Sequence, residues 1–174
     1  MNPDGGNGYV NGPLRSARFR HSQGRFHGLA CDGKGRLYVA DKVNAAIRMV
    51  DLKARTVSTI AGRLPDDPRT GPRDGPGAAA RFHPGGGPTT IFYDRTGDRF
   101  VIHDDDSRTI RTLRRTEGGN GWFVGSLGMR FEGSDGPVAR SAAGVPCGVD
   151  AEGNIYLSRA NHIQVLKRRR EEEE

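Results

Sequence analysis

Four consecutive residues in the middle of the sequence carry the donor groups of a metal site: His103, Asp104, Asp105 and Asp106. Carboxylates beside an imidazole could hold a divalent cation such as calcium. The same residues lie in a short polar segment between two expected strands, where aspartate commonly caps a turn. We therefore favour turn capping and keep a metal site at these four residues as the alternative interpretation.

A second group of side chains has the chemistry of nucleic-acid binding. The stretch "SRTIRTLRR" carries Arg108, Arg111, Arg114 and Arg115. Another stretch, "RSARFRHSQGRFHG", interleaves arginine with phenylalanine, and the net charge of +6 is compatible with an anionic partner. Arginine combined with aromatic residues suits single-stranded RNA. However, "SRTIRTLRR" is expected to form a strand, and the pair Arg18-Phe19 returns as Arg81-Phe82, which favours an architectural role.

The motifs of several common enzyme classes are missing from the sequence. No Gly-Lys-Ser/Thr of a phosphate-binding loop occurs, and "GNGWFV" has Val124 where a dinucleotide-binding motif needs its third glycine. There is no G-x-S-x-G nucleophile motif, and the histidines keep no ligand spacing. We therefore expect no catalytic residues and no cofactor.

A repeated turn motif predicts the secondary-structure elements that position these residues. The motif D-x-x-G occurs at residues 32–35, 94–97 and 150–153. This motif is typical of a type I turn, in which the aspartate accepts bonds from backbone N–H groups and the glycine adopts a positive φ. Each turn follows an apolar run and precedes a stretch rich in β-branched and aromatic residues. The aromatic residues three positions after each glycine are Tyr38, Phe100 and Tyr156. The sequence thus predicts three β-hairpins.

Further elements recur outward from each hairpin. A polar linker leads to a stretch that contains Ile47, Ile110 or Ile163, and then to a fourth expected strand, "TVSTIAG" in the first unit and "GWFVGSLG" in the second. A connecting phrase with Gly-Pro and small residues also recurs, and its glycines are the almost evenly spaced Gly12, Gly75 and Gly136. Four-stranded antiparallel units repeated in tandem predict a β-propeller.

The repeated unit resembles the NHL repeat, whose blade contains A-R-F, a turn, G-x-L-Y-V-A-D, N-x-I-R and V-x-T-x-A-G. The first unit matches at Ala17, Arg18, Phe19, Asp32, Gly35, Leu37, Tyr38, Val39, Ala40, Asp41, Asn44, Ile47, Arg48, Val57, Thr59, Ala61 and Gly62. The second unit keeps Ala80, Arg81, Phe82, Asp94, Gly97, Phe100, Ile110 and Arg111, and the third keeps Asp150, Gly153, Ile155, Tyr156 and Ile163. The resemblance implies an all-β fold, a β-propeller arc of four-stranded antiparallel blades that is incomplete within one chain. NHL propellers commonly close with six blades, whereas this chain codes two and most of a third.

We divide the chain into five segments on this basis. Residues 1–10 are an N-terminal tail or ring-closing strand, 11–62 the first blade with its preceding connector phrase, and 63–128 a connector and the second blade. Residues 129–167 hold a connector and the incomplete third blade, and 168–174 a charged tail. Because an open arc leaves bare blade edges, we expect self-association or a protein partner that covers them.

Composition bears on the setting in which the chain works. The 26 glycines and 10 prolines indicate a turn-rich protein. No run of 18 apolar residues predicts a membrane span, and the N-terminus lacks the features of a secretory signal. Two cysteines, Cys31 and Cys147, are too few for a disulfide framework. We expect a cytoplasmic protein with no membrane partner.

These features together predict a non-catalytic scaffold for protein–protein interactions, or a subunit of a larger assembly. The blades would provide rigid support, and the connector from Arg63 to Gly77 would provide contact surface. Binding of single-stranded RNA through the arginine-rich patches is the second hypothesis. A metal-dependent hydrolase or lyase of propeller type is the third, but the expected innermost strands supply only His27 as a candidate ligand.

Overall fold

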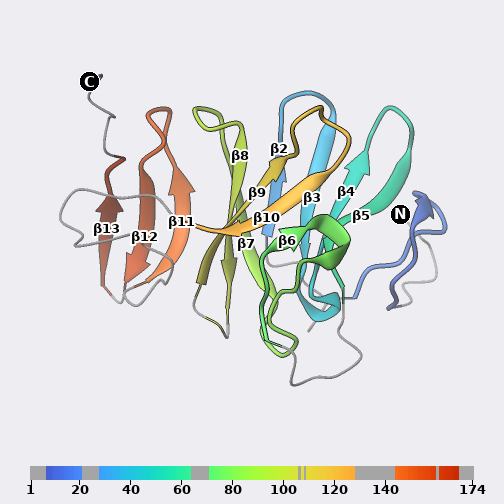
Figure 1. Ribbon diagram of the computed structural model, residues 1–174, viewed down its shortest axis with the longest axis horizontal. Coiled ribbons are helices and arrows are strands. Elements are labelled where there is room, and N and C mark those ends of the chain that lie inside the picture. The colour runs from blue at the N-terminus through green and yellow to red at the C-terminus, as the bar shows by residue number, and fades with distance from the viewer. Residues whose placement is uncertain are drawn as a thin grey trace.

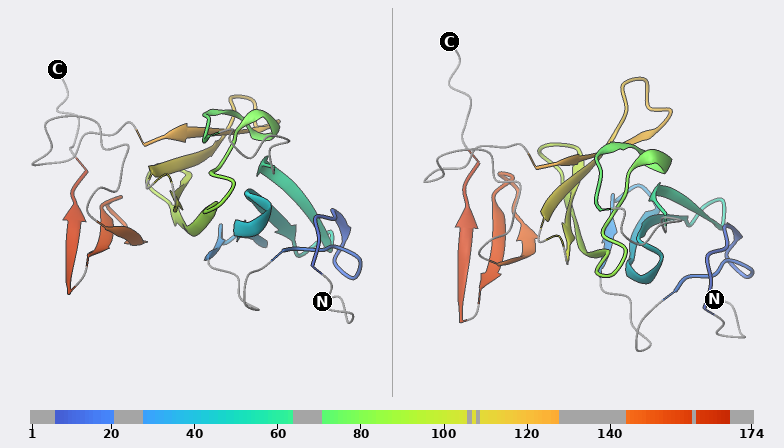
Figure 2. Two further views of the ribbon diagram at one scale, coloured as in Figure 1. Left: turned by 90° about the horizontal axis from the view of Figure 1, so that it is seen from below. Right: turned by 60° about the horizontal axis from the view of Figure 1, so that its bottom comes forward.

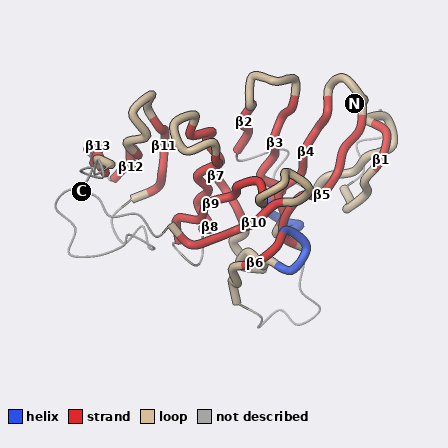
Figure 3. Tube along the Cα trace, turned by 45° about the horizontal axis from the view of Figure 1, so that its top comes forward, coloured by secondary structure: helices blue, strands red, loops and turns tan. Residues whose placement is uncertain are grey.

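The computed structural model describes residues 7–20, 28–63, 71–105, 107, 109–127, 144–159 and 161–168. Within these residues the protein is all-β and consists of antiparallel strands joined by turns and two 3-10 helices of three residues each. Figure 3 shows these two short helices among the strands. In the part of the chain that the structure describes, no helix has the length and apolar character needed to cross a membrane.

The first sheet contains five strands in the order β1-β5-β4-β3-β2, and every neighbouring pair is antiparallel. The strands are β1 (Gly12–Pro13), β2 (Gly28–Cys31), β3 (Arg36–Asp41), β4 (Ala46–Asp51) and β5 (Thr56–Gly62), and the 3-10 helix η1 (Lys42–Asn44) joins β3 to β4. The four longer strands form the expected up-and-down meander (Figure 1). The two-residue strand β1 extends the sheet beyond β5 and was not expected from the sequence.

The second sheet repeats this arrangement in the order β6-β10-β9-β8-β7. Its elements are β6 (Gly75–Pro76), η2 (Gly77–Ala79), β7 (Pro88–Asp94), β8 (Arg99–Asp104), β9 (Thr109–Arg115) and β10 (Trp122–Ser126). The expected strand "GWFVGSLG" is therefore confirmed as β10, and the Gly-Pro phrase again forms the outermost strand.

The third sheet has three described strands in the order β11-β12-β13. They are β11 (Val145–Val149), β12 (Ile155–Arg159) and β13 (His162–Leu166). The third copy of the connecting phrase, around residue 136, lies outside the described residues.

The three sheets lie side by side in chain order (Figures 1 and 2). Strand β7 of the second sheet contacts β2 of the first and β11 of the third. The approach of β2 to β7 is close at Gly28, where an added Cβ atom would lie 2.7 Å from the carbonyl oxygen of Thr89. Glycine is therefore required at this contact between sheets.

Alternating side chains of each sheet bury two separate interfaces, as the period of two along a strand requires. The interface between the first and second sheets contains Tyr38, Ala40, Ile47 and Ala61 from one side and Phe82, Ile91, Phe100, Ile102, Leu113 and Val124 from the other. The interface between the second and third sheets contains Val101, Ile110 and Leu127 packed against Ile155, Leu157 and Leu166. The opposite face of the first sheet packs Val39, Val50 and Val57 against Ala17, with Leu14 and Phe19 partly buried beside them.

The turns behave as expected in the first and third units but not in the second. Gly35 and Gly153 have the expected positive φ of 83° and 82°. In the second unit the left-handed residue is Asp98, with a φ of 40°, and Gly97 is not left-handed. This turn has one more residue than the turn of the first unit, because β8 begins only at Arg99 after Asp94, whereas β3 begins at Arg36 after Asp32.

The extra residue makes the expected equivalence of Tyr38 and Phe100 wrong. A shift by one residue moves a side chain to the opposite face of its sheet, so Val101 takes the place of Tyr38 in the second sheet. Phe100 instead faces the first sheet and lies against Tyr38, with 4.1 Å between the ring centroids. The two rings are partners across an interface rather than copies of one repeat position.

Candidate functional site

The most extensive polar site in the described part of the first sheet is a buried cluster around Arg48. Helix η1 and the left-handed residue Ala45 (φ 49°) reverse the chain between β3 and β4, so that Asp41 at the end of β3 faces Arg48. The Arg48 Nη1 donates to Asp41 Oδ2 at 2.9 Å, and both side chains are fully buried. Burial makes this pair far more demanding in its geometry than an exposed ion pair.

The rest of the guanidinium binds the segment that contains β1. Arg48 Nη1 also donates to the carbonyl oxygen of Arg18 at 3.1 Å, and Nη2 donates to the carbonyl oxygen of Val10 at 2.8 Å and to Asn11 Oδ1 at 2.9 Å. The aromatic rings of Tyr9 and Phe19 lie 5.0 and 4.8 Å from the guanidinium carbon. Arg48 thus ties β4 to the connecting phrase through hydrogen bonds and cation–π contacts.

The second sheet builds the same cluster around Arg111, which is 1% exposed. Its Nη1 donates to Asp104 Oδ2 at 3.4 Å and to the carbonyl oxygen of Arg81 at 3.0 Å. Its Nη2 donates to Asp74 Oδ1 at 2.7 Å. The Phe82 ring centroid is 5.4 Å from the guanidinium carbon. We call each of these clusters an aspartate–arginine clamp.

The two clamps match position by position. Five residues of the second clamp follow their counterparts in the first at one constant interval: Asp104, Arg111, Arg81, Asp74 and Phe82 correspond to Asp41, Arg48, Arg18, Asn11 and Phe19. The backbone donors to the aspartates match as well: the amide of Arg20 donates to Asp41 and the amide of His83 to Asp104, at 3.1 and 3.0 Å. The repeat therefore preserves a three-dimensional arrangement and not only a sequence pattern.

Burial sets the electrostatics of both clamp aspartates. Desolvation raises the pKa of Asp41 and of Asp104 above the ordinary aspartate value, and hydrogen bonds and the adjacent arginines oppose this rise. In each clamp the arginine Nε is buried without a hydrogen-bond partner among the described residues. The carboxylate and guanidinium groups of each clamp bond to one another and to the backbone. The clamps therefore fasten the connecting phrase to its sheet.

The structure does not bring the predicted metal ligands together. Asp104 binds Arg111 in the clamp, and Asp105 accepts a bond from Lys42 of the first sheet at 3.0 Å. His103 is buried with its Nδ1 3.1 Å from Thr89 Oγ1, and burial lowers its pKa. Asp106 lies outside the described residues. Neighbouring strand residues point to opposite faces, and no three metal-ligating side chains converge anywhere among the residues that the structure describes.

The predicted arginine patch is divided by the strand that carries it. Arg111 is in the buried clamp, so its inclusion in a surface RNA site is wrong as the protein is folded here. Arg114 is exposed and lies over the Phe123 ring at 5.5 Å, and Arg115 lies over the Trp122 ring at 4.1 Å. Arg108 lies outside the described residues.

Sequence reasoning missed the clamps, although it matched several of their residues to the NHL repeat. One signal in the sequence could have found them. Acidic or amide residues and arginines recur at the same interval from the first copy to the second. The described strands of the third sheet form no such clamp: their register puts Arg159 in the place of Asp41 and Gln164 in the place of Arg48. The Gln164 Oε1 is buried without a partner among the described residues.

The chain was compared with protein-family models and with curated proteins. No protein-family model matches the chain, and no curated protein is significantly similar to it.

Proposed function

We propose that this chain is a segment of an NHL-type β-propeller and that its sheets serve as blades of a rigid scaffold for protein–protein interactions. The observation that carries the proposal is the pair of aspartate–arginine clamps, which recur with one spacing and fasten each connecting phrase to its own sheet. Two further observations support blades arranged around a centre. The first strand of each meander contacts that of the next sheet, since β7 contacts both β2 and β11, and the strands within each sheet follow one another as a meander.

The division of labour within the repeat supports a scaffold. The arginines and the strand aspartates of the clamps and the inter-sheet interfaces are buried, whereas residues 71–74 of the connector after β5 are exposed, including Asp74 that accepts from Arg111. Rigid repeats with variable connecting segments are a common basis for protein recognition. In this proposal the connector contacts the partner and the clamps hold the connector in place.

We expect a connector variant to lose its partners while it keeps its fold. Arg63→Ser with Arg73→Ser changes two exposed side chains; the second removes the bond from Arg73 to the carbonyl oxygen of Ala79 but leaves its backbone pairing with Arg81 in place. Quantitative affinity purification should then show at least about a tenfold loss of specific partners, with an unchanged melting temperature. Partners that the connector variant retains in full would contradict a role of this connector. The matched control is Lys53→Ser with Arg55→Ser in the exposed β4–β5 turn, which should keep the partners.

Single-stranded RNA binding is a second candidate because Arg114 and Arg115 each stack on an aromatic ring of β10, Arg114 on one face of the second sheet and Arg115 on the other. Paired arginine and aromatic groups can contact phosphates and bases. We expect a fluorescent oligouridine to bind with an affinity that falls steeply with salt, and Arg114→Ser with Arg115→Ser to weaken binding at least about tenfold. Equal binding by the variant, or binding that does not respond to salt, would contradict this candidate.

A further inference from the structure

The two ends of the row of sheets expose apolar side chains whose counterparts inside the row are buried. Ile163 on β13 pairs with Ser158, as Ile47 pairs with Ala40 and Ile110 with His103, so the three isoleucines hold one repeat position. Ile47 and Ile110 are 0% exposed, because each is covered by the following sheet. Ile163 is 57% exposed.

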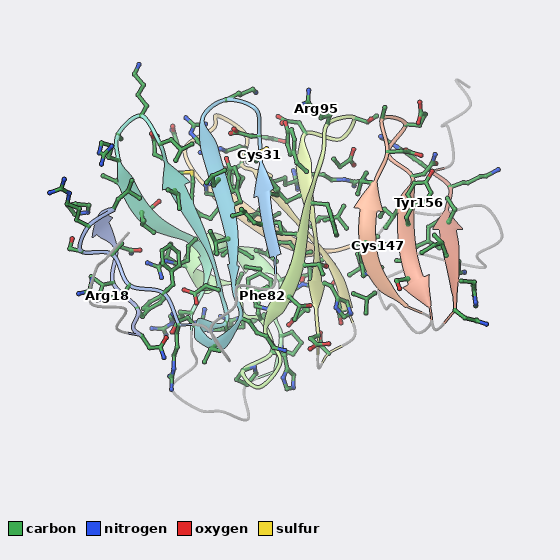
Figure 4. The ribbon with its side chains drawn as sticks, turned by 180° about the vertical axis from the view of Figure 1, so that it is seen from behind. Arg18, Cys31, Phe82, Arg95, Cys147 and Tyr156 are labelled. Carbon is green, nitrogen blue, oxygen red and sulfur yellow. The ribbon has the colours of Figure 1, made fainter. Side chains whose placement is uncertain are left out.

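Other residues on this outer face of the third sheet follow the same pattern. Val165 and Val145 are exposed. Tyr156, which is labelled on the third sheet in Figure 4, is partly exposed, whereas its counterpart Tyr38 is buried against the second sheet. Val145 pairs with Ser158, so it lies on the same face as Ile163. We call Val145, Tyr156, Ile163 and Val165 the trailing face.

At the other end of the row, the first sheet exposes a position that is buried in the second sheet. Leu29 on β2 pairs with Val39, as Ile91 on β7 pairs with Ile102, so Leu29 and Ile91 hold one repeat position. Ile91 is 1% exposed because the first sheet covers it, whereas Leu29 is 60% exposed. Leu37 and Phe19 are partly buried against the cluster that contains Val39. We call Leu29, Leu37 and Phe19 the leading face.

The two interfaces inside the chain show what each end face fits. Each consists of a trailing face, such as Tyr38 and Ile47, packed against the leading face of the next sheet, such as Ile91 and Phe100. The first sheet of another copy presents such a leading face, so it could cover the trailing face of the third sheet. Two different patches on one chain that fit each other give a head-to-tail contact, which ends in a ring when the rotation closes.

We propose that a second copy of this chain docks through its leading face onto the trailing face. Since propellers typically have about four to eight blades, we infer that two copies of the three sheets close head to tail into a ring of six. This inference rests on the proposed blade architecture. It adds the partner that covers the open ends, and it requires both end faces of each copy to be buried in the ring.

The test is the mass of the full chain in solution, measured by light scattering over a range of concentrations. We expect about twice 18.9 kDa for the wild-type chain. Leu29→Glu and Ile163→Glu should each give monomers, with a dissociation constant raised at least about 100-fold, because every interface of the ring would bury an unpaired carboxylate. Leu52→Glu, at an exposed leucine of the β4–β5 turn, is the control and should remain a dimer.

Mixing distinguishes a head-to-tail ring from other dimers. A Leu29→Glu chain keeps its trailing face and an Ile163→Glu chain keeps its leading face, so an equimolar mixture regains one intact interface and should form a heterodimer. Regained association also shows that both variants are folded. A wild-type monomer at all concentrations, or a dimer that Leu29→Glu leaves intact, would overturn the proposal. Neither result affects the scaffold proposal, which is tested separately by the connector variant.

Discussion

Replacing Arg111 with methionine is expected to lower the free energy of unfolding by about 3–5 kcal/mol, since it leaves a buried carboxylate without its cation. The methionine keeps much of the side-chain volume but removes the bonds to Asp104, to the carbonyl oxygen of Arg81 and to Asp74. A loss of this size is a large fraction of the stability of an ordinary domain. Urea denaturation followed by circular dichroism measures it.

Two further variants separate the clamp from the general effect of losing an arginine. Arg114→Met removes an exposed arginine further along the same strand and should change stability by no more than about 0.5 kcal/mol. Asp104→Leu combined with Arg111→Met removes both buried charges and should recover part of the loss. Equal losses in Arg111→Met and Arg114→Met would show that the clamp contributes nothing special to stability.

Replacing Phe82 with alanine is expected to cost about 3–5 kcal/mol, the range for truncation of a buried aromatic side chain. Phe82 is fully buried between the first and second sheets, where an added Cβ on Gly62 would lie 2.6 Å from its ring (Figure 4). Its ring also lies over the Arg111 guanidinium. The variant therefore loses apolar burial at the interface and one wall of the clamp, and urea denaturation measures the loss.

The repeat supplies the matched control for this prediction. Phe19 holds the same position in the preceding repeat, and its ring lies over Arg48 in the same way. However, Phe19 is only partly buried, because no described sheet precedes the first one. In the Ile163→Glu background, in which the end faces stay uncovered, Phe19→Ala should therefore cost clearly less than Phe82→Ala. A cost as large as that of Phe82→Ala would mean that burial between sheets is not what stabilises this position.

The sequence alone was sufficient to predict the local elements. The turn at Asp32 forms as expected, with Oδ1 accepting from the amide of Lys34 at 2.7 Å, and the turn at Asp150 accepts from the amide of Glu152 at 3.0 Å. Strands such as "RLYVAD" and "TIRTLRR" also form where their composition predicts them. These features depend on interactions within a few residues, which is why a linear pattern contains them.

Features that depend on register or on distant partners required the tertiary structure. One added residue in the turn before Arg99 turned Phe100 from a repeat copy of Tyr38 into its packing partner. The candidate RNA-binding residue Arg111 became part of a buried clamp, because the connecting phrase returns to the edge of its sheet and places Asp74 within 2.7 Å of it.

One physical cause explains why residues of the same type at equivalent repeat positions differ in their roles. The sequence determined that arginine, aspartate and phenylalanine recur at a constant interval, and that short strands alternate with turns. Only the packing of one sheet on the next decided which recurring residues are buried: Ile47 and Ile110 have a sheet against them and Ile163 has none among the described residues. Burial is a property of the neighbours that a residue meets, and those neighbours lie far away along the chain.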